Sequence, residues 1–485
     1  MSNTAQTAAG KRIAGLLDAD SFVEVGSFVT ARNTDFNLAA KDTPADGVLT
    51  GYGTIDGALV YVYSQDATVL GGAIGEMHAK KIVKLYDMAM KMGAPVIGLV
   101  DCAGLRLQEA TDALEAFGSL YLCQTKAGGV IPQITAIFGT CGGGMAIVPS
   151  LTDFTFMEAE KAKLFVNAPN ALDGNEVSKC DTSAAAFQSE EAGIVDFVGS
   201  EAEIFANIRE LVGILPANNA DGSPEYDCTD DLNRVCAGLE GFAKDTRAAI
   251  SVIADDNYFL ETKAAYARDM VTGFIRLDGM TVGVVANCSA EYDENGEVKA
   301  EYDAVLSVNG CKKAADFVTF CDAFEIPVLT LTAVKGFKAC KCSEKNISRE
   351  AARLTAAFAQ ATVPKVNVIV GEAYGSAYLT MNSKSIGADI VYAWTDAAIG
   401  MMDATAAVKI IYADEIAQAD SANVVISEKA VEYRQLQSSA YAAARRGYVD
   451  DIIDAQDTRK RVIAAFEMLY SKREDQPYKK HGTTV

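Results

Sequence analysis

The sequence predicts an α/β fold built from two copies of one unit, and three observations lead to this prediction. Short apolar runs rich in β-branched residues alternate with helix-length segments, which is typical of buried parallel strands joined by helices. The proline and glycine pattern of the first half returns in the second half at a constant spacing. The 485 residues are 50% hydrophobic and 22% charged, so the chain can bury two large cores.

The repeat is visible in the residue numbers of its prolines and glycines. Pro95 corresponds to Pro327, and Pro132 corresponds to Pro364 at the same spacing. Three glycine pairs share this spacing, namely Gly104 and Gly336, Gly139 and Gly371, and Gly143 and Gly375. We therefore predict two domains, residues 1–245 and 246–485. Residues 218–236, rich in Asn, Asp, Gly and Pro, are the predicted linker.

The predicted elements follow from hydrophobic periodicity. Continuous apolar runs bounded by turn residues predict strands at residues 96–100, 134–138, 328–331 and 366–370. Apolar residues three or four apart predict helices at residues 77–92, 113–125, 311–324 and 350–360. Residues 458–480 are predicted to form a basic amphipathic helix followed by a tail. An acidic loop is predicted at residues 291–297.

Composition excludes several classes of function. The chain has 43 Lys and Arg against 65 Asp and Glu, and its net charge of −22 argues against nucleic acid as a partner. No segment has the length and apolarity of a spanning helix and no secretory signal is visible, so a cytoplasmic protein is expected. Eleven cysteines and 2 histidines, with Cys340 and Cys342 as the one close pair, predict reduced thiols and no metal site.

Glycine-rich turns follow one predicted strand in each copy. The candidate catalytic residues there are Gly143, Gly144 and Met145 in the first copy and Gly375, Ser376 and Ala377 in the second. Small residues let a ligand approach the backbone, and the N–H groups of a following helix can stabilise a developing negative oxygen. The alternative interpretation is that the glycines only allow a tight turn between strand and helix that packs under the sheet. The presence of two such turns at equivalent positions of the repeat favours a functional role.

A third glycine loop, at Gly71 and Gly72, precedes a predicted helix that carries His78, Lys80 and Lys81. Together with Arg106 these cations predict a site for a phosphate-bearing ligand, and a solvated basic face is the alternative. The sequence contains no P-loop, no GxGxxG fingerprint and no nucleophile elbow. If the protein is an enzyme, we expect its backbone N–H groups to polarise the substrate, and we expect no catalytic triad of side chains.

Several low-degeneracy stretches resemble the carboxyltransferase subunits of biotin-dependent acyl-CoA carboxylases and decarboxylases. These stretches are GYGTIDGALVYVYSQD (51–66), GAPVIGLVDCAGLRLQE (93–109), GVIPQITAIFGTCGGG (129–144), AYGSAY (373–378) and GYVDDII (447–453). The resemblance implies two crotonase-like units in tandem, one for a coenzyme A thioester and one for biotin. It also implies a biotin carrier protein, a biotin carboxylase or a membrane decarboxylase subunit as partners, and a homohexamer.

The resemblance further implies that carboxyl transfer proceeds through an enolate. The turn at Gly143 would hold the thioester oxygen, and the turn at Gly375 would hold the ureido oxygen of biotin. Leu379 occupies a position that is Asp in propionyl-preferring relatives, so the acyl group, propionyl or acetyl, stays open. Ser376 and Lys335 replace a glycine and a proline of the family pattern, and residues 183–195 also depart from it.

These departures leave other functions open. A non-catalytic scaffold that binds coenzyme A is one alternative, and a subunit working in the decarboxylase direction of a sodium pump is another. A hydratase or isomerase of the crotonase type is a third, but such enzymes use one unit and a carboxylate base.

Overall fold

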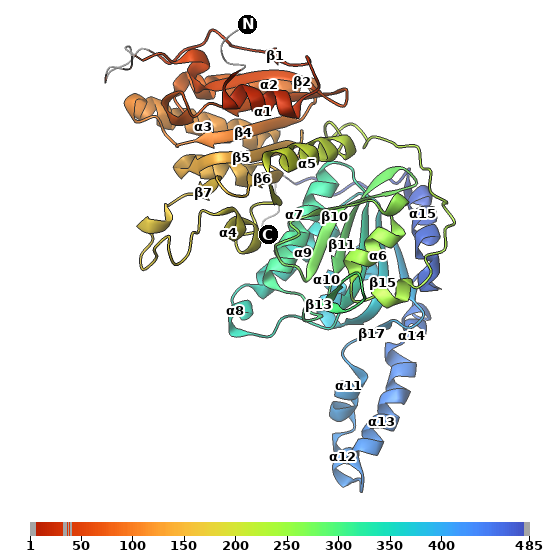
Figure 1. Ribbon diagram of the computed structural model, residues 1–485. Coiled ribbons are helices and arrows are strands. Elements are labelled where there is room, and N and C mark those ends of the chain that lie inside the picture. The colour runs from red at the N-terminus through yellow and green to blue at the C-terminus, as the bar shows by residue number, and fades with distance from the viewer. Residues whose placement is uncertain (1–5, 33–35, 37, 39–40, 480–485) are drawn as a thin grey trace. The chain divides into compact units, whose positions relative to one another are not determined.

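The computed structural model describes residues 6–32, 36, 38 and 41–479. The chain divides into two compact units, Met1–Pro224 and Glu225–Val485, and each has its own large sheet (Figure 1). The division falls inside the predicted linker, residues 218–236.

The sheet of the first unit has the order β1-β2-β3-β4-β5-β6-β8, with β7 paired to β5. The strands are β1 (Val23–Glu24), β2 (Val48–Ile55), β3 (Ala58–Gln65), β4 (Val96–Cys102), β5 (Gln133–Gly142), β6 (Phe154–Glu158), β7 (Lys163–Phe165) and β8 (Phe197–Gly199). The helices are α1 (Ala8–Leu16), α2 (Glu76–Met92), α3 (Ala110–Ala127), α4 (Ala185–Glu190) and α5 (Glu201–Ile214). β2 and β3 form an antiparallel hairpin, and the strands from β3 to β8 are parallel.

The second unit repeats this topology in the order β18-β16-β15-β14-β11-β10-β9, with β17 paired to β15. Its strands are β9 (Phe259–Thr262), β10 (Met270–Leu277), β11 (Met280–Asn287), β12 (Ala290–Tyr292), β13 (Val298–Glu301), β14 (Val328–Val334), β15 (Lys365–Tyr374), β16 (Ile390–Trp394), β17 (Ala398–Gly400) and β18 (Asp451–Ile453). Its helices are α6 (Thr246–Ile253), α7 (Val308–Ala323), α8 (Lys341–Glu344), α9 (Ile347–Gln360), α10 (Gly375–Thr380), α11 (Ala404–Ile411), α12 (Ala413–Gln418), α13 (Ala422–Tyr433), α14 (Ala440–Ala444) and α15 (Thr458–Leu469).

Strand register confirms the repeat. Val96 of β4 pairs with Gln133 of β5. In the second unit, Val328 of β14 pairs with Lys365 of β15, and both residues lie one repeat spacing after their counterparts. Both strand pairs have a register irregularity near their carboxyl ends. The predicted α/β fold with a duplicated unit is therefore confirmed.

The eight strands and helices predicted within the repeat are present, most of them longer by a few residues at their ends. One other expectation needs correction. Residues 291–297 are not a plain loop, because β12 and β13 pair as an antiparallel hairpin across them. The predicted basic helix with a tail is confirmed, because α15 ends at Leu469 and residues 470–479 after it form no helix or strand.

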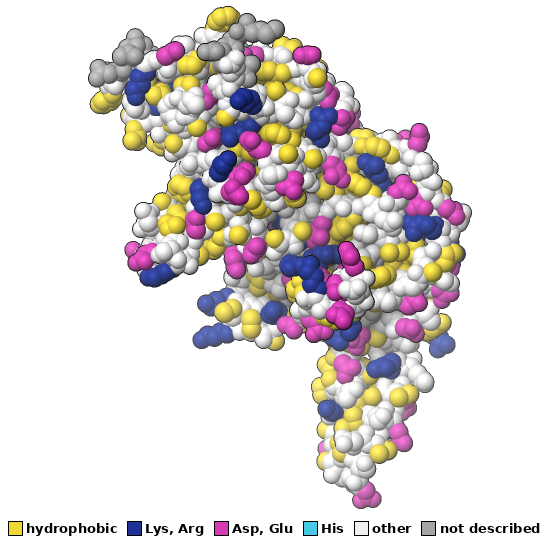
Figure 2. Space-filling model, in the orientation of Figure 1, with side chains coloured by type: hydrophobic (Ala, Val, Ile, Leu, Met, Phe, Trp, Pro, Cys, Tyr) yellow, Lys and Arg dark blue, Asp and Glu magenta, His cyan; other side chains and the backbone are white. Residues whose placement is uncertain are grey.

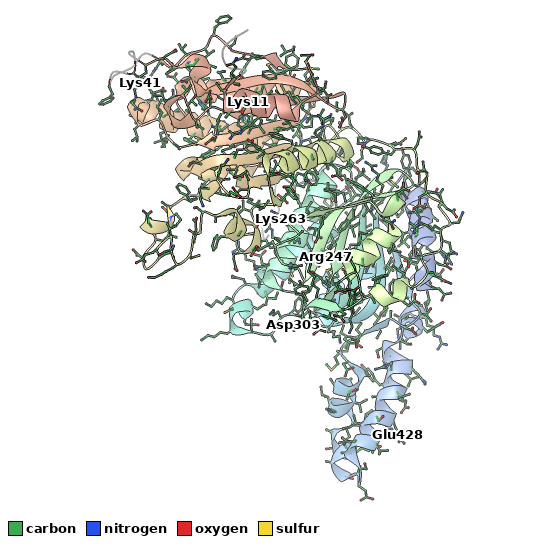
Figure 3. All side chains as sticks on the ribbon, viewed as in Figure 1. Lys11, Lys41, Arg247, Lys263, Asp303 and Glu428 are labelled. Atoms are coloured by element: carbon green, nitrogen blue, oxygen red, sulfur yellow. The ribbon has the colours of Figure 1, made fainter. Side chains whose placement is uncertain are left out.

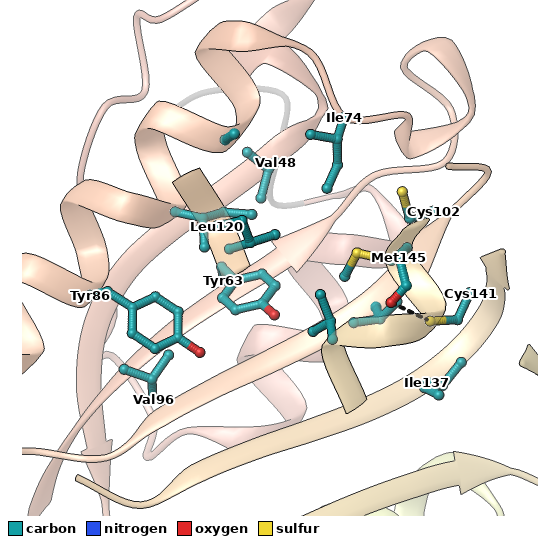
Figure 4. Close-up of a cluster of buried hydrophobic side chains, with 14 of the residues drawn as sticks. Val48, Tyr63, Ile74, Tyr86, Val96, Cys102, Leu120, Ile137, Cys141 and Met145 are labelled. Carbon is teal, nitrogen blue, oxygen red and sulfur yellow. Dashed lines mark hydrogen bonds between the residues drawn. The ribbon is translucent and has the colours of Figure 1, made fainter. Parts of the chain in front are cut away.

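Each unit has a separate apolar core. Tyr63 of β3, Tyr86 of α2, Leu120 of α3 and Ile137 of β5 belong to the first core (Figure 4). Helices α2 and α3 thus share one apolar core with strands of the sheet. Within the described ranges no helix has both the length and the apolarity needed to cross a membrane.

Candidate functional site

The same glycine turn ends the central strand of each unit. Gly142 is extended (φ −114°, ψ 155°) and Gly143 then takes φ +60°. Tyr374 is extended (φ −124°, ψ 143°) and Gly375 takes φ +61°. A positive φ is strained for residues with a side chain, so both turns require glycine. Corresponding positions of the two copies thus share one backbone conformation.

Each turn leads directly into a helix. The first is a 3₁₀ helix, Gly143–Leu151, which contains Pro149, and the second is α10. The prediction of a helix after each turn is confirmed, although only the second is an α-helix. The first N–H groups of any helix have no acceptor within it. Each turn can therefore offer backbone donors to an oxygen that gains negative charge.

The side chains beside these donors are mostly buried. Met145 and Ala377 have exposed fractions of 0% and 1%, so they could act only through their backbone. The Tyr121 hydroxyl donates a 2.6 Å hydrogen bond to the Gly144 carbonyl. The Cys141 thiol donates to the Met145 carbonyl at 3.4 Å (Figure 4). Both hydrogen bonds fix backbone carbonyls of the first turn. Tyr121 could not be predicted from the sequence, because no spacing rule connects it to the turn.

An exposed apolar side chain follows each turn at the same position. Leu379 of α10 is 43% exposed, and Ile147 in the first unit is 42% exposed. The two positions correspond to each other in the repeat. Ile147 was missed from the sequence, although the repeat spacing would have identified it once Leu379 was chosen. Each side chain can contact a ligand that approaches its turn.

The third loop is shaped by close backbone contacts. Gly71 and Gly72 both have positive φ, 69° and 63°. A Cβ atom on Gly72 would lie 2.1 Å from the Asp101 carbonyl oxygen, so a larger residue is excluded there. The bridge between Ile74 and Leu105 continues the contact between this loop and the end of β4. The loop is therefore packed closely against the end of β4.

Arg106 lies inside the unit and not on its surface. Its guanidinium donates 2.6 Å and 2.7 Å hydrogen bonds to carboxylate oxygens of Asp46 and Glu109, and all three side chains are fully buried. Glu109 also accepts a 2.6 Å bond from the backbone N–H of Glu76, the first residue of α2. A carboxylate of the protein therefore occupies the helix N-terminus at which the sequence predicts a phosphate.

His78 and Lys81 are buried as well. Burial lowers the pKa of His78 to about 3, so the ring is neutral, and it bonds the Asp46 carbonyl at 2.9 Å. The Lys81 amino group donates to the carbonyls of Ala45 and Val48, and burial lowers its pKa to about 8. Lys80 is exposed and pairs with Glu76. The expected cluster of surface cations is thus reduced to Lys80, because the other side chains satisfy buried backbone and carboxylate groups.

The described residues contain no group of three or more His, Cys, Asp or Glu side chains arranged to hold a metal ion. Cys340 and Cys342 are exposed free thiols.

Comparison with known proteins gives one consistent result. The family described as "Carboxyl transferase domain" matches residues 3–484. A methylmalonyl-CoA decarboxylase subunit alpha of Propionigenium modestum and a propionyl-CoA carboxylase carboxyltransferase subunit of Haloferax mediterranei are each 40% identical, over 98% of this chain and 92% of the relative. The crystal structure of a transcarboxylase 12S hexamer with hydrolysed methylmalonyl-coenzyme A bound matches with a TM-score of 0.91 at 37% identity, over 98% of this chain and 92% of that one.

Proposed function

This chain belongs to the carboxyl transferase family, and from this premise we propose that it moves a carboxyl group between biotin on a partner carrier protein and the α-carbon of a short-chain acyl-CoA. The observation that carries the proposal is the pair of matching turns at Gly143 and Gly375, with φ +60° and +61°. A transfer between two substrates creates negative charge on two oxygens, and the duplicated fold supplies one set of backbone donors for each.

In the first unit, the N–H groups of Gly143, Gly144 and Met145 would stabilise the thioester oxygen as the α-carbon becomes an enolate. In the second unit, those of Gly375, Ser376 and Ala377 would stabilise the ureido oxygen of biotin. Fixed donors help the transition state more than the ground state, because the charge is greatest there. Losing one such donor typically slows the reaction about 10²- to 10³-fold. We assign no side-chain base.

The acyl-CoA would bind along the loop of Gly71 and Gly72 in the first unit. Lys80 is the candidate for direct contact with a phosphate, because it is exposed. His78, Lys81 and Arg106 would shape the loop from inside, since their side chains bond to buried groups of the unit. In this proposal residues 1–245 form the acyl-CoA domain and residues 246–485 the biotin domain.

The relatives suggest an assembly. The transcarboxylase 12S protein is a hexamer in a multienzyme core, and that structure supports the proposal of a homohexamer for this chain. A biotin carrier, and either a biotin carboxylase or a membrane decarboxylase subunit, would complete the complex. The decarboxylase relative and the carboxylase relative are equally similar, at 40% identity, so partners rather than this chain would set the direction.

Isotope exchange tests the proposed function. Purified protein is mixed with malonyl-CoA or methylmalonyl-CoA labelled in the free carboxylate, together with free biotin or a biotinylated carrier. We expect label to move to biotin, and the faster of the two substrates identifies the acyl group. Binding of the CoA thioesters without any exchange would replace this proposal with the scaffold alternative.

Leu379 tests the acyl preference within the same assay. Its exposed side chain follows the second turn, so a carboxylate there would alter the polarity beside the reacting groups. We predict that Leu379→Asp shifts the ratio of exchange with methylmalonyl-CoA to exchange with malonyl-CoA at least threefold. Tyr441→Phe, at an exposed position of α14, is the control and should leave the ratio unchanged. An unaltered ratio in Leu379→Asp would remove this residue from the pocket.

A further inference from the structure

Two exposed thiols lie close together on the segment that joins β14 to α9. Cys340 and Cys342 are both exposed, and of the nine other cysteines of the chain eight are buried or half-buried. A thiol must meet solvent to exchange with a dissolved disulfide. Cys180 is the remaining exposed cysteine, and it stands alone in its loop. Both thiols of the pair are therefore accessible to a dissolved disulfide, and each has a second thiol two residues away with which it can form a bridge.

The backbone places the pair within bridging range. Lys341, between the two cysteines, is the first residue of α8. Residues two apart in a helix have Cα atoms about 5.5 Å apart, and disulfides span about 4.4 to 6.8 Å. Cys340 is the N-cap, with extended backbone (φ −148°, ψ 155°), so its side chain is not held in a helical direction. A bridge needs only a local rearrangement.

That rearrangement has a defined consequence for α8. The Cys340 sulfur accepts a 3.3 Å hydrogen bond from the backbone N–H of Ser343, which caps the helix. A sulfur bonded to Cys342 has to leave this position. Since α8 has only four residues, it depends strongly on its cap.

The segment that carries the pair, residues 335–345, has more basic than acidic side chains in a protein of net charge −22. Figure 2 shows basic side chains gathered over α8, and the lysines of this segment are Lys335, Lys338, Lys341 and Lys345. Lys335 pairs with Glu372 at 2.5 Å, and Lys338 pairs with Asp303, which is labelled in Figure 3, at 3.5 Å. Glu344 is the one acidic residue among residues 335–345. Lys341 and Lys345 form no ion pair within the described ranges. Such a patch attracts a small anionic reagent.

We propose that Cys340 and Cys342 are a thiol–disulfide pair that reacts with small anionic disulfides, and that closure of the bridge releases the cap of α8. This inference does not depend on the carboxyl transfer proposed above. In the first step one thiolate attacks the reagent, so a mixed disulfide forms and one reagent thiolate leaves. The second cysteine then attacks the mixed disulfide, so the internal bridge forms and a second reagent thiolate leaves. The two cysteines are oxidised, the reagent disulfide is reduced to two thiols, and the two cysteine protons pass to them.

Peptide mapping tests the bridge, because trypsin cuts between the two cysteines. The full-length protein is treated with oxidised glutathione, its remaining thiols are alkylated, and it is digested without reductant. Cleavage after Lys338, Lys341 and Lys345 puts Cys340 and Cys342 on separate short peptides, 339–341 and 342–345. We expect these peptides to appear joined, and to separate after reduction. Mixing isotope-labelled and unlabelled protein before oxidation should give no doubly labelled hybrid, since the bridge is internal.

Single variants provide the matched controls. Cys340→Ser and Cys342→Ser should each retain a stable glutathione adduct on the remaining cysteine, and the same outcome is expected at the exposed Cys180 of the unaltered protein. Amide exchange of residues 341–346 should become at least tenfold faster on oxidation, because the cap is lost. Stable adducts on both cysteines of the unaltered protein, hybrid peptides, or no reaction would each overturn the pair. A joined peptide with unchanged amide exchange would overturn the release of the cap.

Discussion

Gly143 is the residue on which the proposed chemistry depends most directly. Its φ is +60° at the turn after β5, and a Cβ atom at this position would have no neighbour within 4 Å. A lack of space for a side chain therefore does not explain the glycine at this position. The positive φ explains it, because this backbone conformation is disfavoured for residues with a side chain.

Gly143→Pro tests this assignment. Proline fixes φ at about −65° and has no N–H, so it removes one donor and misplaces its neighbours. We predict that exchange between acyl-CoA and biotin falls at least 100-fold. Gly174→Pro is the control, because Gly174 also has a positive φ (73°) and open surroundings but lies in an exposed loop. Equal loss in both variants, or unchanged exchange in Gly143→Pro, would show that the thioester oxygen is held elsewhere.

Asp153 gives the first unit a pH-dependent stability. Burial raises the pKa of this carboxyl from 3.8 to about 7, although it accepts a 2.7 Å hydrogen bond from the Gln133 N–H. Asp389, in the corresponding place of the second unit, accepts from the Lys365 N–H and has the Lys472 amino group at 2.9 Å. In the second unit a lysine amino group thus lies beside the carboxylate. In the first unit burial is the main cause of the raised pKa of Asp153.

The sign of the pH effect follows from proton counts. Between pH 4 and 7 the folded state keeps the Asp153 proton and the unfolded state loses it, so this group's contribution to the unfolding free energy falls as pH rises, by up to about 1.4 kcal/mol per unit. We predict that Asp153→Asn, which keeps an acceptor for Gln133, gains stability relative to the unaltered protein as pH rises through this window. Thermal unfolding midpoints at several pH values, at one protein concentration, measure the difference. A difference independent of pH would contradict the assignment.

Residue roles were only partly predictable from sequence. The glycines at both turns could be predicted, because the positive φ at these positions requires glycine and the repeat places it at the same register in both copies. The burial of His78, Lys81 and Arg106 could not, because a cation that satisfies buried carbonyls looks the same in a sequence as one that faces solvent. Partners such as Asp46, 60 residues before Arg106, meet it only through the fold.

At the scale of elements, the two units share a device in helices α2 and α7. Lys81 and Lys313 are equivalent positions of the repeat, and both amino groups are buried and donate to two backbone carbonyls. The carbonyls belong to the segments that lead into β2 and β10. Burial lowers the pKa of Lys313 to about 7. Each lysine thus fixes the chain before the first long strand of its unit.

Neighbouring lysines give an internal control for this device. We predict that Lys81→Met and Lys313→Met each lower the free energy of unfolding by roughly 2 to 4 kcal/mol, because two buried carbonyls lose their donor. Lys80→Met and Lys312→Met, at the exposed positions beside them, should change it by less than about 0.5 kcal/mol. Denaturant titration of all four variants provides the comparison. Equal effects at buried and exposed positions would show that the carbonyls find other donors.

The elements themselves were the most predictable part of the fold. Buried parallel strands such as β4 and β5 are continuous apolar runs in the sequence. Because of the repeat, each such run has a counterpart in the second unit that supports the same prediction. The hairpin of β12 and β13 was missed because its strands are short and polar, with three of the four residues Val298–Glu301 exposed. Ala290 and Glu291 of β12 are buried, but a strand of three residues is too short to show a period in the sequence.

At the scale of the whole molecule, one part of the second unit lacks a core of its own. Helices α11, α12 and α13 extend away from the sheet (Figure 1), and no residue of α12 or α13 is buried within the described chain. Ile410 and Ile411 at the end of α11 are 68% and 59% exposed. Such exposed apolar side chains on short helices are typical of surfaces that another chain covers. We expect this arm, residues 404–433, to contact a second copy in the proposed hexamer.

Charge substitutions on the arm test this expectation. Ile410→Glu combined with Ile411→Glu would place two carboxylates in an apolar contact, and desolvating them costs several kcal/mol. We predict at least 100-fold weaker association, which is about 2.7 kcal/mol, and smaller species in analytical ultracentrifugation. The control is Gln418→Glu combined with Asn423→Glu, which adds the same charge at exposed polar positions of the arm. A hexamer that persists in the Ile variant with an unchanged dissociation constant would show that the arm faces solvent in the assembly.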